Sequence, residues 1–284
     1  METFDCDPTM TDTQVMEFCE QGFLVLEDIV PPEIDLKTLE FLDAFYATQP
    51  LDLPERTATI PTDLFSEDWF RDNVVLHPQV TGILRSLLGK NFTLPDFLSN
   101  HRIKCPMPAE VPGETSHRWH RDGTQGVRVP KLESVDFSKR NSLDGAQNCL
   151  QVFYYPQDVP LELGPTELVP GSHLIQGEGQ YEVASFLRLL DNRGNMPNSH
   201  HQDVSTGSIT ITSYPIWHRR TASTGEGIRN NLKYRYSRTV RPRGDWIAEP
   251  SFEILRQDHP IHTGSCPEVA DAADMFAWLS GREP

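Results

Sequence analysis

The sequence contains few cysteines and no pattern that would pair them. The five cysteines are scattered, odd in number and without a Cys-x-x-Cys spacing, so neither a disulfide framework nor a zinc cluster is indicated. Long apolar runs are also absent, since none approaches the ~20 residues of a membrane span. Residues 1–7 lack the basic and apolar regions of a signal peptide. We therefore expect reduced thiols, a cytoplasmic location and no membrane partner.

Positive charge is scarce as well. The chain has 25 Lys and Arg against 41 Asp and Glu, which gives a formal net charge of −16. Nucleic acids require a positive surface, so no nucleic-acid partner is expected, and solubility explains the negative excess. The basic residues that are present crowd one segment, where most should be solvated or ion-paired. They include Arg219, Arg220, Arg229, Lys233, Arg235, Arg238, Arg241 and Arg243.

No internal repeat is evident, and a length of 284 residues suits a single domain. A hydrophobic content of 37% with 23 prolines and 18 glycines indicates many short elements joined by turns. We divide the domain 1–284 into a helix and strand part at about 10–90, a jelly-roll core at about 92–243 and a tail with a helix at 244–284. The composition fits a monomer and a homodimer equally.

Periodic apolar positions predict three helices and one strand in the first 90 residues. Helix-start residues open the first helix, and Gly22 and Gly89 should end the first and third. Residues 50–70, rich in Pro, Thr and Asp, are predicted to be a surface loop. The expected elements are helices at 11–22, 34–46 and 80–88 and a strand at 23–28.

From Phe92 onward, short β-type runs between turn residues predict an antiparallel sandwich or barrel. Two polar stretches, 123–146 and 176–206, are too long for hairpin loops and are predicted to be lids over an active site or disordered segments. A helix at 267–280 should pack against the barrel. The predicted strands lie within 92–104, 117–122, 148–156, 164–170, 207–214 and 230–240.

The most informative stretch is Trp-His-Arg-Asp-Gly at 119–123. In an extended segment residues two apart share a face, so His120 and Asp122 can point to one side together. With a second imidazole they would complete the 2-His-1-carboxylate triad, which leaves coordination positions on Fe(II) open for chemistry. In a chain with ten histidines such a pair can arise by coincidence. The hypothesis therefore requires a third ligand.

A candidate third ligand and a candidate anion anchor follow in the last β-type runs. The alternating run 207–213 leads into His218, and a jelly roll can bring this strand beside the one that carries the His-x-Asp pair. Arg229 then opens a run in which Asn231 and Lys233 share its face. An inward guanidinium is costly unless it holds an anion, and a carboxylate is its natural partner.

Several motifs of the chain together resemble a known family. They are Trp-His-Arg-Asp-Gly at 119–123, Gln-Val-Phe-Tyr-Tyr at 151–155, Gly-Pro-Thr-Glu-Leu-Val-Pro-Gly-Ser-His at 164–173, His218 and Arg229. They resemble the phytanoyl-CoA dioxygenase-like family of Fe(II)/2-oxoglutarate oxygenases. The resemblance spans most of the chain, and the Pro-Gly-Ser-His turn is its most specific mark. The segment 219–228 departs from the family because it lacks the usual Asn-x-Ser.

The resemblance implies a mainly β fold, a double-stranded β-helix of the cupin-like jelly-roll type with flanking helices. It implies Fe(II) at positions matching His120, Asp122 and His218, the 2-oxoglutarate carboxylate at Arg229, and Thr166 near this cosubstrate. It further implies that O₂ is a reactant, with ascorbate as a stimulant. The expected reaction oxidises an unactivated C–H bond of a small metabolite in secondary metabolism. Hydroxylation is the usual outcome, and desaturation, ring formation and epimerisation need the same triad.

Two other histidine sites are not assigned as metal ligands. His173 follows the tight Pro-Gly-Ser turn, where a histidine is more often a structural hydrogen-bonding residue. His201 and Asp203 form a second His-x-Asp, but 196–201 is predicted to be loop, so nothing holds the two side chains on one face. We expect this second motif to belong to the lid at 176–206.

Other classes of function remain open at this stage. A non-catalytic metal-binding jelly roll would explain the fold, and a cupin-type isomerase or zinc hydrolase would need no arginine anchor. Among oxygenases, an acyl-CoA hydroxylase is the alternative to an enzyme acting on a small apolar or amphipathic metabolite. The net charge of −16 would repel the phosphates of CoA and favours the small metabolite.

Overall fold

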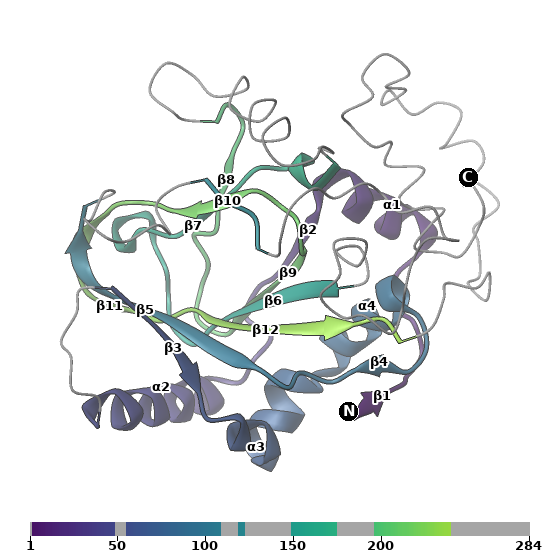
Figure 1. Ribbon diagram of the computed structural model, residues 1–284, viewed down its shortest axis with the longest axis horizontal. Helices are drawn as coiled ribbons and strands as arrows, with labels where there is room; N and C mark the ends of the chain where they lie inside the picture. The colour runs from purple at the N-terminus through teal and green to yellow at the C-terminus, as the bar shows by residue number, and fades with distance from the viewer. Residues whose placement is uncertain (1, 49–54, 109–118, 123–148, 175–195, 240–284) are drawn as a thin grey trace.

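The computed structural model of the protein describes residues 2–48, 55–108, 119–122, 149–174 and 196–239. The described strands form a larger and a smaller antiparallel sheet, and α2 and α3 lie along the outer side of the larger one, below it in Figure 1. This is the mainly β jelly roll with flanking helices that the sequence predicted. The stretch 123–146, most of 176–206 and the helix expected at 267–280 lie outside the described residues.

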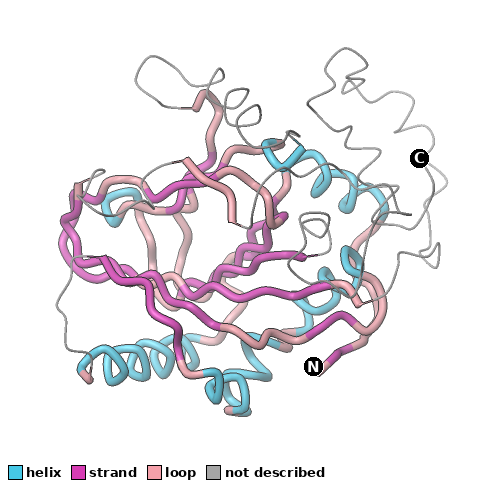
Figure 2. Tube along the Cα trace, viewed as in Figure 1, coloured by secondary structure: helices cyan, strands magenta, loops and turns pink. Residues whose placement is uncertain are grey.

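The four α-helices of the described chain all precede residue 90 and are cyan in Figure 2. The Thr11 side chain accepts a hydrogen bond from Gln14 N while the Gln14 side chain accepts one from Thr11 N, a capping box that starts the first helix. None of the described helices has the length and apolar character needed to cross a membrane. The bounds are α1 Asp12–Gln21, α2 Pro32–Ala47, α3 Asp68–Phe70 and α4 Pro78–Leu88.

The larger sheet runs in the order β1-β4-β12-β6-β9-β2, and β5 pairs with β12, β3 and β11. Strand β6 is central, with Phe153 opposite Lys233 on one side and Thr210 on the other. The bounds are β1 Thr3–Phe4, β2 Phe23–Leu26, β3 Glu55–Ile60, β4 Phe92–Thr93, β5 Leu98–Met107, β6 Cys149–Tyr155, β9 Ser208–Ser213, β11 Ser223–Arg229 and β12 Leu232–Ser237.

The smaller sheet has the order β10-β7-β8, with bounds β7 Thr166–Leu168, β8 His200–His201 and β10 His218–Arg220. In Figure 1 it lies above the larger sheet, on the side away from α2 and α3. The two sheets approach each other where the ring centroids of His218 and Phe153 are 6.3 Å apart. His218 therefore lies between the sheets rather than on the outer surface.

The two faces of the larger sheet serve different purposes. On β12, Tyr234 and Tyr236 are fully buried in the main hydrophobic core with the helices. Because side chains alternate along a strand, Lys233 and Arg235 project from the opposite face, toward the smaller sheet. β6 and β9 follow the same pattern. Their core residues are Leu150, Val152, Tyr154, Ile209 and Ile211, and the other face carries Gln151, Phe153, Tyr155, Thr210 and Thr212.

Several sequence predictions for individual elements are wrong. The surface loop predicted at 50–70 is wrong for its described part, 55–70, because β3 pairs along β5 and α3 follows a short 3-10 helix at Thr62–Ser66. Buried Leu64 and Phe70 anchor this stretch, and the polar composition around them hid the pattern. The strand expected at 92–104 is two strands, since Pro95 interrupts it. The segment 219–228, not predicted as strand, forms most of β10 and β11.

The Pro-Gly-Ser-His turn packs against the end of α1. Gly22 ends this helix in the left-handed region at φ +79°, and Gly171 N donates to Gln21 O at 3.0 Å. His173 is buried with its Nε2 2.7 Å from Cys19 O, and burial lowers the pKa of His173 to about 4. A Cβ at Gly22 would overlap the imidazole, 2.7 Å from its Cε1. His173 is thus placed in a structural position against the end of α1, and it is not a member of the His120, Asp122 and His218 group.

We expect Gly22→Ala to lower the melting temperature, because a left-handed alanine costs roughly 1–2 kcal/mol and the overlap with His173 adds to this. Thermal unfolding followed by circular dichroism measures the loss. In a Gly22→Ala/His173→Ala double variant the overlap is gone, so the combined loss should be smaller than the sum of the single losses. Strictly additive losses would contradict the proposed contact.

Asp35, in the first turn of α2, is a buried carboxyl under the larger sheet. It is 2% exposed, and its Oδ1 accepts a hydrogen bond from the Tyr154 hydroxyl at 2.7 Å. Its Oδ2 is buried and has no hydrogen-bond partner among the described residues. Burial raises the pKa of Asp35 to about 6, against the opposing effect of the Tyr154 hydrogen bond. Folding therefore favours the protonated carboxyl.

A raised pKa means that Asp35 contributes stability below its unfolded pKa of about 4 and that this contribution is lost as pH rises through about 6. We expect Asp35→Asn to gain stability relative to the native protein across this window, by up to about 3 kcal/mol at neutral pH. Urea unfolding at pH 4, 5, 6 and 7.5 measures it. Exposed Asp63→Asn is the matched control for one lost negative charge, and a difference independent of pH would refute the assignment.

Candidate metal centre

Two histidines far apart in the sequence face each other across a backbone pair. His120 N donates to His218 O at 3.0 Å, and His218 N donates to His120 O at 2.9 Å. This reciprocal antiparallel bridge holds the two imidazole rings with their centroids 4.3 Å apart. On the other edge of β10, His218 lies opposite Leu168. The bridge thus attaches the segment 119–122 to the smaller sheet.

The orientation of the His218 ring leaves one nitrogen available for a metal. Its Nδ1 lies 3.0 Å from Ile216 O, a geometry in which Nδ1 carries the proton and Nε2 the lone pair. Nε2 lies 3.6 Å from Asp122 Oδ2. Burial, followed by the neighbouring His120, lowers the pKa of His218 to about 4. A neutral imidazole therefore points at a carboxylate.

Two side chains of the larger sheet hold the Asp122 carboxylate. Lys233 Nζ donates to Asp122 Oδ2 at 2.9 Å and Gln151 Nε2 donates to the same oxygen at 2.8 Å. Burial alone would raise the pKa of Asp122, but the electrostatic interactions with His218 and Lys233 and these two hydrogen bonds outweigh it and lower the pKa. The carboxylate stays ionised, as a metal ligand must.

The donor set fits a metal ion. One ligand atom from each of His120, Asp122 and His218 can be chosen so that all three lie within 4.8 Å of one another. In the part of the chain that the structure describes, no other group of His, Cys, Asp or Glu gathers in this way. Two imidazoles and one carboxylate are the ligands of the facial triad that binds Fe(II) and leaves open positions.

Arg229, the predicted anion anchor, ends β11 and is 2% exposed. Its Nη1 donates to Gly164 O. The Tyr155 hydroxyl nearby donates to Gln202 Oε1, and Asn231 Nδ2 donates to Thr166 Oγ1 at 3.4 Å. Gln202 Nε2 is buried with no hydrogen-bond partner among the described residues. A buried guanidinium beside an unsatisfied amide donor fits a carboxylate ligand.

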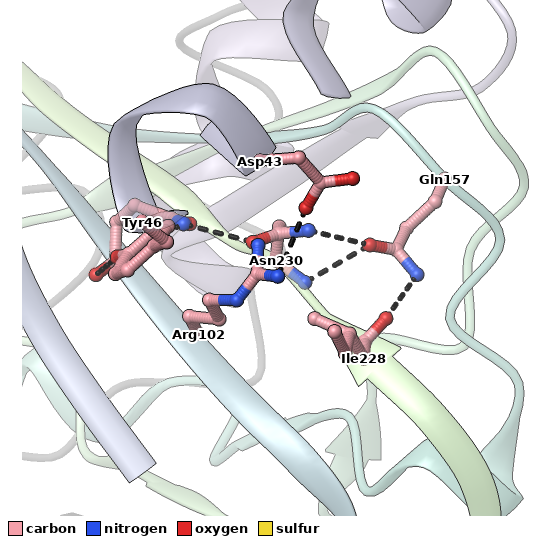
Figure 3. A network of polar contacts seen from close by, with 7 residues as sticks. Asp43, Tyr46, Arg102, Gln157, Ile228 and Asn230 are labelled. Carbon is pink, nitrogen blue, oxygen red and sulfur yellow. Dashed lines mark hydrogen bonds and ion pairs between the residues drawn. The ribbon is translucent and has the colours of Figure 1, made fainter. Parts of the chain in front are cut away.

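A polar network on the α2 side of the larger sheet connects the junction of β11 and β12, which directly follows Arg229, to neighbouring elements (Figure 3). Asn230 at this junction connects to β5 and to the segment after β6, and Arg102 connects it to α2. The guanidinium of Arg102 also lies 4.6 Å from the Tyr46 ring centroid. The contacts are Arg102 Nη2 to Asp43 Oδ1 at 2.9 Å, Asn230 N and Nδ2 to Gln157 Oε1 at 3.0 and 3.1 Å, and Gln157 Nε2 to Ile228 O at 2.6 Å.

The second His-x-Asp motif does not form a metal group. His200 and His201 form β8, so the prediction of a loop at this point is wrong; pairing with β7 determines the strand. His200 stacks on Phe23 with ring centroids 4.8 Å apart, and His201 Nε2 lies 3.9 Å from Glu167 Oε1. Asp203 is exposed. Gln202, between His201 and Asp203, accepts the hydrogen bond from the Tyr155 hydroxyl described above, near Arg229.

Sequence reasoning assigned no role to Lys233, Gln151 or His101, which all lie beside the candidate ligands. His101 is on β5, and burial, with the charges of Lys233 and Arg229, lowers its pKa to about 3. Alternation of side chains along the strands was the sequence feature that could have indicated that these residues face inward. Lys233 shares the face of Arg229, and His101 lies two residues before buried Ile103. No motif identified which of these inward residues would reach Asp122.

The comparison with known families decides the relationship. The sequence profile of the family described as phytanoyl-CoA dioxygenase matches residues 18–230. The chain belongs to the phytanoyl-CoA dioxygenase family. It is therefore a member of the non-haem iron and 2-oxoglutarate-dependent oxygenases, as the motifs had indicated. Among curated proteins, none matches the chain by sequence.

Several solved structures share this fold. HygX from Streptomyces hygroscopicus, with nickel and 2-oxoglutarate bound, is 15% identical with a TM-score of 0.58, over 82% of this chain and 89% of that one. AviO1 from Streptomyces viridochromogenes Tue57 is 17% identical with a TM-score of 0.53, over 83% and 98%. EctD from S. alaskensis, with iron bound, is 14% identical with a TM-score of 0.54, over 84% and 80%. These similarities support the jelly-roll fold of this family member.

We expect His120→Ala, Asp122→Ala and His218→Ala each to lose stoichiometric Fe(II) binding and turnover while remaining folded, because each deletes one of three protein ligands. Metal content after anaerobic reconstitution measures the first effect and circular dichroism checks the fold. The matched control is His201→Ala/Asp203→Ala, which removes the second motif and should keep one Fe(II) per chain. Full iron binding in any of the three single variants would refute this ligand set.

Proposed function

We propose that the protein is an Fe(II)- and 2-oxoglutarate-dependent dioxygenase that oxidises an unactivated C–H bond of a small organic metabolite, most simply by hydroxylation. The proposal depends on one observation: one ligand atom from each of His120, Asp122 and His218 lies within 4.8 Å of the others, and the buried Arg229 lies on the same side of the larger sheet. Membership of the family supports the reaction type. One HygX structure contains hygromycin B, and SnoN is an epimerase from nogalamycin biosynthesis. These neighbours support a setting in secondary metabolism.

The side chains have distinct roles in this proposal. Fe(II), when bound with 2-oxoglutarate and O₂, would supply the oxidant for the C–H bond, with succinate and CO₂ as the products of 2-oxoglutarate. His120, Asp122 and His218 would hold the metal, and Lys233 and Gln151 would orient the carboxylate ligand and keep it ionised.

The cosubstrate end of the site would be supplied by a second set of residues. Arg229 would bind the C5 carboxylate of 2-oxoglutarate through a charge-assisted pair. Thr166 and Gln202, which lie on the same polar cluster, would add neutral hydrogen bonds. Holding the cosubstrate at both ends fixes the direction from which a substrate C–H bond meets the metal.

One experiment separates this function from the alternatives. Adding 2-oxoglutarate to the anaerobic Fe(II) protein should produce a visible charge-transfer absorption band, and later admission of O₂ with ascorbate should release succinate. A non-catalytic jelly roll, a cupin-type isomerase or a zinc hydrolase would give neither signal. Absence of both the band and succinate would overturn the proposed function.

Arg229→Ala should keep iron but require more 2-oxoglutarate, by roughly 30-fold or more, since losing one partner of a buried charge pair costs roughly 2–5 kcal/mol. Titration of the charge-transfer band with 2-oxoglutarate measures the shift. Arg229→Lys is the matched control, because it keeps the charge but loses the bidentate geometry. Its 2-oxoglutarate requirement should lie between those of the native protein and Arg229→Ala. An unchanged 2-oxoglutarate requirement in Arg229→Ala would place the anchor elsewhere.

A further inference from the structure

A second cation lies on the metal side of the larger sheet, further along β12 than Lys233. Tyr234 and Tyr236 are buried in the helix-side core, so Arg235 between them projects to the other face, as Lys233 does. Lys233 reaches Asp122 from that face. Arg229, Lys233 and Arg235 therefore follow one another on the same side, with Lys233 at the candidate ligand and the two arginines on either side of it.

The register places Arg235 directly beside the groups that hold Asp122. Arg235 lies opposite Gln151 on β6, and Gln151 lies opposite Thr212 on β9. Directly opposed residues of an antiparallel pair project to the same side. Gln151 on that side donates to Asp122 Oδ2 at 2.8 Å. Arg235 is thus one strand away from a residue that touches the candidate metal ligand.

Arg235 has a partner, but a neutral one. Its Nη1 donates to the Tyr214 hydroxyl at 2.8 Å, and its guanidinium carbon lies 5.4 Å from the centroid of the same ring. Within the described part of the chain no carboxylate pairs with Arg235. A guanidinium has five N–H donors, so several remain for a ligand. Because the Tyr214 oxygen accepts from Arg235, its own proton also remains to be donated.

The charges around the site leave Arg235 uncompensated. Asp122 is paired with Lys233. Under the proposed function, one carboxylate of 2-oxoglutarate offsets Arg229 and the other offsets the metal. Arg235 then adds positive charge that nothing in the described site balances. Arg235 is half-buried, and where the effective dielectric constant is lower than in water, such a charge attracts an anion more strongly than on the surface.

We propose that Arg235 and Tyr214 anchor the primary substrate through an oxyanion group, a carboxylate or a phosphate. The inference rests on the proposed function and adds the substrate class: a small organic acid or phosphate ester, bound on the side of the metal centre away from Arg229. The guanidinium supplies charge and a forked pair of donors, and the tyrosine hydroxyl supplies a third donor. This narrows the expected small amphipathic metabolite to one with an anionic end.

Binding of simple probes tests the anchor without knowledge of the natural substrate. Protein loaded with Ni(II) and saturating 2-oxoglutarate is titrated by calorimetry with benzoate, phenyl phosphate and the neutral isostere benzamide. We expect at least one oxyanion to bind roughly tenfold or more tightly than benzamide, the scale of a hydrogen bond to a charged group. Arg235→Gln should abolish this preference. The benzoate and phenyl phosphate arms distinguish a carboxylate substrate from a phosphate ester.

Matched variants isolate the anchor from general effects. Arg71→Gln removes one positive charge from an exposed pair with Glu2 and should keep the preference for oxyanions. Arg235→Lys keeps the positive charge but loses the paired N–H donors of the guanidinium, and it should keep part of the preference for oxyanions over benzamide. Tyr214→Phe removes the hydroxyl donor and should weaken oxyanion binding several-fold. Thermal unfolding of each variant checks its fold.

Three results would overturn the inference. They are no oxyanion preference in the native protein, an undiminished preference in Arg235→Gln, and displacement of the probe by tenfold more 2-oxoglutarate, which would place it in the cosubstrate site. The proposed function is tested separately, before any probe is added. If the metal-loaded protein does not bind 2-oxoglutarate, the proposed function fails; if it does and the probes bind without preference, only the anchor fails.

Discussion

Two backbone hydrogen bonds between His120 and His218 are the interaction on which the site depends. They join the segment 119–122 to the smaller sheet and bring the two imidazoles to a centroid separation of 4.3 Å. A backbone bridge determines ligand spacing more firmly than side-chain contacts, because it leaves only side-chain torsions to adjust. The turn at 170–173 supports it from behind, where Ser172 Oγ accepts from Trp217 N at 2.9 Å.

The larger sheet links stability and chemistry through alternation along single strands. On β12 and β6, every second residue packs into the helix-side core, and Lys233 and Gln151 on the opposite face reach the candidate metal ligand Asp122. Tyr234 and Lys233 are neighbours in sequence, yet one is fully buried among aromatic rings and the other holds Asp122. Because the core residues fix the register, they also fix the position of the polar residues between them.

An acidic protein can still have a positive interior. The net charge of −16 belongs to the whole chain, whereas Arg229, Lys233 and Arg235 project together from one side of two consecutive strands. Local potential between two sheets is determined by the nearest charges, because distant surface charges are screened by solvent. The arrangement would favour anionic ligands at the candidate site although the whole chain is acidic, as the proposed oxyanion anchor requires.

The sequence by itself determined the fold class, the three longer N-terminal helices, most strands and the family, because apolar periodicity, capping residues and local motifs are properties of neighbouring residues. It also indicated His120, Asp122, His218 and Arg229 as candidates. Only the tertiary structure decided that β3 fills part of 50–70, that His200 and His201 form a strand, and that Lys233 and Gln151 hold Asp122. Those features depend on pairing between strands that are distant in the chain. The residues near each position in the sequence do not specify which distant strand will pair with it.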